Sequence, residues 1–166
     1  MTIRSAAKAV ILRDNRILLQ HCVDTGLGLD YYELPGGGQL PQESLYDALR
    51  RECLEETGYS VRVLRLFALS EEIITVESVK RDFPHHAHRM FHIFLCEIED
   101  VPHQSHTEED VHQVTMEWLP IEDVAKLRLR PLNLAAAIPH LLACGEAQWL
   151  GTSWLHDFRH IGGATP

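Results

Sequence analysis

The stretch LPGGGQLPQESLYDALRRECLEETGY, residues 34–59, constrains the fold of this chain more than any other segment. It opens with three consecutive glycines, which lack a Cβ atom and let the backbone turn sharply or approach another group closely. Residues 44–57 are predicted to form a helix, because Ser44 is suited to cap its start and Gly58 to end it. A tight turn is therefore expected directly before a helix.

The predicted helix breaks the usual separation of apolar and charged side chains. At 100° per residue, six residues fall on one side of it: Leu45, Ala48, Leu49, Glu52, Glu55 and Glu56. An ordinary amphipathic helix keeps its acidic groups opposite its apolar stripe. Like charges three and four residues apart repel each other, and the helix dipole disfavours acids in the last turns. Several local rules broken at one place indicate a functional site.

A hard divalent cation would remove this conflict. Carboxylates spaced i, i+3 and i+4 can converge on Mg²⁺, and the glycine turn can offer a carbonyl to the metal or an N–H group to an anion. The alternative is a solvated acidic helix end that Arg50 and Arg51 neutralise. The position directly after a strand and three glycines favours the metal site.

The spacing of this segment resembles the Nudix box, G-x5-E-x7-R-E-U-x-E-E-x-G-U, in which U is aliphatic. Gly37 and Glu43 occupy the first two fixed positions, and RECLEETGY at residues 51–59 supplies the rest. Cys53 and Tyr59 replace the aliphatic residues, but both positions are apolar packing positions. YYELPGGG before the box and MEWLPIEDVAKL after it also look like segments of the Nudix hydrolase family.

The resemblance implies an α/β fold, the Nudix-type α/β/α sandwich with a mixed β-sheet. It also implies hydrolysis of a diphosphate linkage in a nucleoside diphosphate derivative, by attack of water at phosphorus. Mg²⁺, or Mn²⁺ in its place, would neutralise the diphosphate and acidify the water, whose proton a carboxylate would accept.

Functional roles are carried over onto the matching positions of the box. Glu55 and Glu56 match the principal metal ligands, Gly36 matches a residue that lends its carbonyl, and Glu52 matches a ligand or general base. Arg51 and Glu43 match an ion pair that braces the loop. In some relatives a loop glutamate before the late strand serves as base or ligand. Glu108, Glu109 and Asp110 lie in that loop, and the sequence does not decide which of them, if any, has this role. The predicted sets are Glu52, Glu55, Glu56 and Glu109 for catalysis; Gly36, Glu52, Glu55 and Glu56 for the metal; and Gly37, Gly38 and Arg51 for substrate.

The composition of the chain limits the kinds of partner that it can bind. The formal charge of −9 argues against binding to a nucleic acid backbone, which needs a basic surface. No apolar run approaches the 18 residues of a membrane span, and the four cysteines are scattered. We therefore expect a soluble, cytoplasmic enzyme with a small-molecule nucleoside diphosphate or triphosphate substrate, without nucleic acid or membrane partners. A homodimer is left open. A Nudix-fold nucleotide sensor or interaction module without turnover is the alternative.

The rest of the chain predicts a mixed sheet with helices on both faces. We expect one Nudix hydrolase domain over residues 1–144 and a C-terminal tail over 145–166 that packs on it. Segments 80–87 and 100–110 are predicted to be polar loops, and the helical pattern of 131–144 is interrupted or kinked at Pro139. The predicted strands cover residues 5–12, 16–22, 31–34, 61–69 with an extension through 73–76, 89–98 and 112–118, and a short helix covers 120–127.

Two further groups leave alternatives open. His85, His86, His88 and His92 suggest either a zinc site or, more in keeping with a polar loop, the rim of a substrate site. Glu71 and Glu72 could supply another ligand or lie in an exposed turn. The box does not identify the substrate, which could be a nucleotide sugar such as ADP-ribose or a nucleoside triphosphate.

Overall fold

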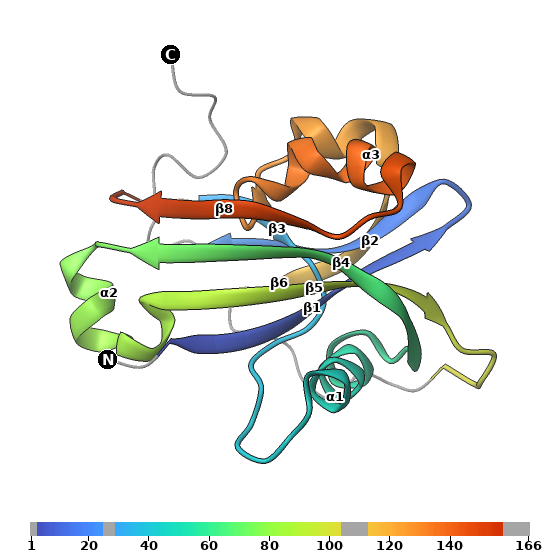
Figure 1. The fold of residues 1–166 in the computed structure, drawn as a ribbon, viewed down its shortest axis with the longest axis horizontal. Helices are drawn as coiled ribbons and strands as arrows, with labels where there is room; N and C mark the ends of the chain where they lie inside the picture. Colours follow the sequence, from blue (N-terminus) through green and yellow to red (C-terminus); the bar gives the residue numbers. More distant parts are fainter. Residues whose placement is uncertain (1–2, 25–28, 104–112, 158–166) are drawn as a thin grey trace.

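The computed structural model describes residues 3–24, 29–103 and 113–157. A mixed sheet lies between helix α1 on one face and helix α3 on the other (Figure 1). This is the predicted α/β/α arrangement. The strands are β1 (Arg4–Arg13), β2 (Arg16–Asp24), β3 (Leu29–Glu33), β4 (Val61–Ile74), β5 (His88–Ile98), β6 (Gln113–Pro120), β7 (Leu129–Arg130) and β8 (Gln148–Leu155). The helices are α1 (Leu45–Thr57), α2 (Glu77–Asp82) and α3 (Leu134–Cys144), with 3₁₀ segments η1 (Pro84–His86) and η2 (Ile121–Lys126).

The strand order is β7-β3-β2-β1-β5-β4-β8, and β6 also pairs with β2. Strand β5 lies between β1, to which it is parallel, and β4, to which it is antiparallel, so its predicted central position is confirmed. Strands β1 and β2 pair only beside their connecting turn, at Leu12 with Ile17 and Arg13 with Arg16. Further along, the two strands diverge and leave one edge of β1 without a neighbouring strand.

The glycine segment fills that edge. The amide of Ala9 donates to the carbonyl of Pro35 over 2.9 Å, and the amide of Ala7 donates to the carbonyl of Gly37 over 2.9 Å. These bonds satisfy backbone groups of β1 that β2 no longer pairs. The segment that connects β3 to α1 is therefore fixed against the middle of the sheet.

Alternate residues of β1 serve the two faces of the sheet. On one face, Ala7 and Ala9 belong to the core that α1 covers with Ala48, Leu49 and Cys53. On the other face a second core includes α3, η2 and the opposite side of the strands, with Val10, Phe67, Ile93, Leu134 and Ile138 among its members. The small residues of β1 allow α1 to pack closely on its face.

Several predicted elements differ from the structure. Segment 80–87 is not a continuous loop, because it contains the end of α2 and all of η1. The helix predicted from residue 131 begins at Leu134, and it continues through Pro139 on its exposed side. The tail contributes β8, which pairs in parallel with β4 through contacts such as Ile74 with Leu155. The division into residues 1–144 and 145–166 remains a prediction.

No helix in the described parts of the chain is both long and apolar enough to cross a bilayer.

Candidate active site

The glycine turn is shaped by two close approaches. Gly36 has φ = +114°, which L side chains rarely adopt, and a Cβ atom there would overlap the backbone carbonyl oxygen of Ala7. A Cβ atom on Gly37 would overlap the carboxylate of Glu52. Gly36 is thus required for the fit against β1, whereas Gly37 leaves space for an acidic side chain of α1.

Local signals set the limits of α1. The Ser44 hydroxyl accepts a hydrogen bond from the Asp47 amide at 3.1 Å, as expected of a helix N-cap. Gly58 adopts the left-handed conformation, and its amide donates to the carbonyl of Leu54 over 2.9 Å. Both predicted ends of the helix are confirmed, which places the glutamates in its last turns.

Glu56 reaches back to the glycine turn. The Gly36 amide donates to Glu56 Oε2 over 2.7 Å. Burial raises the pKa of Glu56 to about 7, although Lys8 and the Gly36 amide act in the opposite direction. The site therefore holds a half-buried carboxylate whose negative charge is only partly compensated by its neighbours.

Arg51 gathers the other acidic groups. Its Nη1 donates to Glu52 Oε1 over 2.8 Å and to Glu55 Oε2 over 3.0 Å, and its Nε donates to Glu43 Oε1 over 2.9 Å. Its Nη2 donates to the carbonyl of Gly38 over 3.2 Å. The hydrogen bonds to Glu43 above all raise the pKa of the Arg51 guanidinium. The structure thus contains the expected Glu43–Arg51 ion pair and extends it to two predicted metal ligands.

Lys8 is a component of the site that the sequence analysis missed. Its Nζ donates to the carbonyl of Leu34 over 3.0 Å and to the carbonyl of Gly36, and it lies 3.6 Å from Glu33 Oε2. The available signal was a single lysine inside the apolar run SAAKAVIL, where a charge needs a buried partner.

Behind the turn lies a buried ion network. Arg130 Nη2 donates to Glu72 Oε1 over 2.7 Å, Arg89 Nε donates to the same oxygen over 3.1 Å, and Arg130 Nη1 lies 3.5 Å from Glu33 Oε1. Glu72 is completely buried in β4, so of its two alternatives the exposed turn is wrong. Burial raises the pKa of Glu72, but the two guanidinium groups outweigh it and lower the value to about 2.

The histidines do not form a common site. His88 Nε2 lies 2.8 Å from Glu71 Oε1, His86 Nε2 lies 2.8 Å from Arg4 Nη1, and His92 Nδ1 lies 3.5 Å from Ser5 Oγ. His85 is exposed on η1. Glu71 lies in β4 rather than in a turn and also accepts a hydrogen bond from Thr152 Oγ1 at 2.6 Å. The zinc alternative therefore has no support from these side chains.

Glu109, predicted to be catalytic, lies outside the described residues, as do Glu108 and Asp110.

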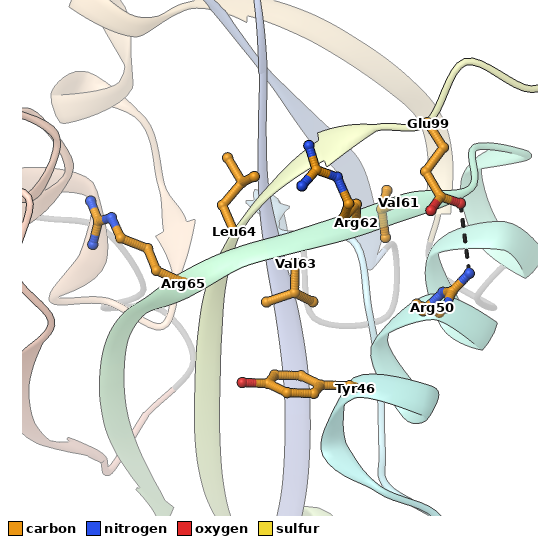
Figure 2. Close-up of a pocket in the computed structure, with 8 residues that line it drawn as sticks. All are labelled: Tyr46, Arg50, Val61, Arg62, Val63, Leu64, Arg65 and Glu99. Atoms are coloured by element: carbon orange, nitrogen blue, oxygen red, sulfur yellow. Dashed lines mark ion pairs between the residues drawn. The ribbon is translucent and has the colours of Figure 1, made fainter.

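A separate surface pocket of about 340 Å³ lies between α1 and the first half of β4 (Figure 2). Tyr46 of α1 faces Val63 of β4 across it, whereas Arg62 points away from α1. Arg50 of α1 lies 3.6 Å from Glu99. This pocket contains none of the predicted catalytic or metal-binding residues.

A divalent cation fits the acidic side of the site by the chemistry of its donors. Glu52, Glu55, Glu56 and the Gly36 carbonyl offer only oxygen atoms, which Mg²⁺ and Mn²⁺ prefer. As they stand, no three acidic, histidine or cysteine side chains in the described part of the chain are grouped closely enough to hold a metal ion. The contacts explain this, because Arg51 holds Glu52 and Glu55 while Lys8 holds the Gly36 carbonyl.

The family model described as the NUDIX domain matches residues 2–141. The chain therefore belongs to the NUDIX family, the family of Nudix pyrophosphohydrolases. No curated protein sequence matches the chain.

Solved structures show the same fold. A NUDIX hydrolase from Nitrosomonas europaea is similar with a TM-score of 0.66 and 21% identity, covering 87% of this chain and 90% of that one. An ADP-ribose pyrophosphatase from Streptococcus suis is similar with a TM-score of 0.60 and 21% identity, covering 89% and 99%. The E. coli ORF135 protein is similar with a TM-score of 0.60 and 25% identity, covering 87% and 94%.

Proposed function

We propose that the protein hydrolyses a diphosphate linkage in a nucleoside diphosphate derivative, with Mg²⁺ or Mn²⁺ held by Glu52, Glu55, Glu56 and the Gly36 carbonyl. The observation that carries this proposal is the contact between the acidic end of α1 and the glycine turn. The Gly36 amide binds Glu56, and Gly37 leaves room for the carboxylate of Glu52. Carboxylates and backbone donors are thereby brought to one place.

The bound cation supplies charge neutralisation for the diphosphate and a lower pKa for the attacking water. The residues of this chain determine where the cation would be held. Arg51 joins the loop to the helix through Glu43 and the Gly38 carbonyl, which keeps the turn and the acids in a fixed relation. Amides of the glycine turn are the natural donors to phosphate oxygens, and Gly37 and Gly38 are proposed in that role.

A carboxylate must take the proton of the water as it attacks phosphorus. The proposed acceptors are Glu52 and Glu109. Because Glu52 lies beside the glycine turn, it is close to the place where the diphosphate would lie. Variants of Glu52 and Glu109 compared at saturating metal would separate the base from the ligands, since the loss of a ligand also weakens metal binding.

The test is a screen of nucleoside diphosphate compounds for phosphate-containing products, with and without Mg²⁺ or Mn²⁺. Glu56→Gln keeps the size of the side chain and removes its charge. We expect it to lower activity by at least about a hundredfold and to leave folding unchanged, because charge stabilisation through a metal contributes several kcal/mol. Glu122→Gln, on the exposed side of η2, is the matched control and should keep full activity.

Two substrate classes are compared by their products. A nucleotide sugar such as ADP-ribose, the substrate named for the Streptococcus suis enzyme, would yield AMP and ribose phosphate. A nucleoside triphosphate would yield a monophosphate and inorganic pyrophosphate. Release of only inorganic phosphate from a monophosphate would contradict both, because the bond broken would not be a diphosphate linkage.

The alternative is a nucleotide sensor without turnover. Its signature would be tight binding of one nucleotide with no product from any compound in the screen. The protein retains Glu52, Glu55 and Glu56, which a module without turnover would not need, and this favours the enzyme.

A further inference from the structure

Lys8 places a positive charge inside the sheet, directly beside the proposed metal site. Its side chain is only 10% exposed, and its neighbours along β1, Ala7 and Ala9, are fully buried. A buried ammonium is costly unless acceptors surround it. Here the acceptors are the carbonyls of Leu34 and Gly36, with the carboxylate of Glu33 at 3.6 Å.

The ammonium is hydrogen-bonded to the Gly36 carbonyl oxygen, which is also a proposed ligand of the metal. Lys8 donates to the carbonyl of Gly36, while the amide of the same residue donates to Glu56. Lys8 thus provides a positive charge next to the Gly36 carbonyl oxygen. Arg51 does the same for the carboxylates of Glu52 and Glu55.

We propose that Lys8 is an internal cation that holds the Gly36 carbonyl in the metal-free protein and that a divalent ion must displace from this oxygen. The inference rests on the proposed metal site. Two cations bonded to one carbonyl oxygen repel each other, and the repulsion is strong in a site shielded from water. Lys8 therefore orders the turn without metal and weakens metal binding.

The surroundings of Lys8 allow this exchange. Lysine carries a compact charge on a flexible stem with three donors, so losing one acceptor need not expel it. The Leu34 carbonyl and the Glu33 carboxylate remain available on its other side. A rigid bidentate guanidinium could not release one carbonyl as easily.

The test is Mn²⁺ binding by Lys8→Met, followed by the electron paramagnetic resonance signal of free Mn²⁺. We expect the dissociation constant to fall at least about tenfold and the melting temperature of the metal-free protein to fall as well, because two carbonyls lose their donor. Lys126→Met is the matched control, since Lys126 is 76% exposed and pairs only with Asp123 in the described contacts. It should change neither quantity.

Equal or weaker Mn²⁺ binding by folded Lys8→Met would overturn the inference and leave the proposed metal site standing. Absence of Mn²⁺ binding by the wild-type protein would overturn both. The two failures are therefore distinguishable.

A second measurement needs no variant. The chain has three lysines, Lys8, Lys80 and Lys126, so ¹⁵N-lysine labelling gives three ammonium signals. On addition of Mg²⁺, we expect the signal of Lys8 to shift and to exchange faster with water, because it loses a hydrogen bond, while the other two stay in place. A Lys8 signal that does not move at saturating Mg²⁺ would contradict the proposed displacement even if Lys8→Met fails to fold.

Discussion

Replacing Glu72 by glutamine tests whether the buried ion network behind the glycine turn stabilises the fold. Glu72 is completely buried, and one of its carboxylate oxygens accepts hydrogen bonds from both Arg89 and Arg130. Glutamine has nearly the same shape but no charge, so Arg89 and Arg130 would lose the counter-ion they share in a buried place, and Glu33 would remain 3.5 Å from Arg130. The change therefore removes charge without creating a cavity.

The expected magnitude follows from the pKa of Glu72. The ordinary value is 4.5 and the value in the folded protein is about 2, a difference of about 2.5 pH units. At about 1.36 kcal/mol per unit, the charge of Glu72 contributes about 3 kcal/mol to the free energy of unfolding at neutral pH. This agrees with the roughly 3–5 kcal/mol lost when one partner of a buried ion pair is removed.

The sign of the pH dependence follows from the lowered pKa. A carboxyl whose pKa is lower in the folded state contributes its full stability above pH 4.5 and loses it as the pH falls towards about 2. The free energy difference between wild type and Glu72→Gln should therefore shrink by roughly 1 kcal/mol between pH 7 and about pH 3.5. Taking the difference cancels the titration of the other acids.

The assay is urea unfolding at both pH values, followed by tryptophan fluorescence. Glu77→Gln is the control, because Glu77 is 86% exposed in its pair with Lys80 and should not change stability measurably. Equal stability of wild type and Glu72→Gln at pH 7, or a difference that stays constant on acidification, would refute the reasoning.

Four further substitutions test the turn and the helix. Gly36→Ala should lower the melting temperature strongly, because its Cβ atom meets a backbone carbonyl, whereas Gly37→Ala should melt like wild type and lose activity; equal effects of the two would contradict the division of roles. Arg51→Gln should lower both the melting temperature and the activity, because it breaks the link between loop and helix; an active variant with an unchanged melting curve would speak against that link. Ser44→Ala should reduce the free energy of unfolding by about 1 kcal/mol in urea titrations through loss of the N-cap, without changing the affinity for Mn²⁺.

Much of the fold and of the candidate site follows from local sequence. Ser44 and Gly58 determine where α1 begins and ends, because capping depends on backbone groups within a few residues. The glycine run and the glutamate spacing predict a metal site for the same reason, since residues three and four apart on a helix share a side. Glu52, Glu55 and Glu56 therefore share one side of the helix independently of the tertiary contacts of the chain.

The sequence alone did not determine which charges meet across the sheet. Lys8 and Gly36 are 28 residues apart, and Glu72 and Arg130 are 58 apart. The pairing of β8 with β4 likewise joins distant segments, and no spacing rule predicts it. Such contacts depend on strand order and register, which are set by the burial of both faces of the sheet together. Glu72 in an acidic pair looks like part of a solvated turn, and only the arginines brought in by β5 and β7 make it a buried ion.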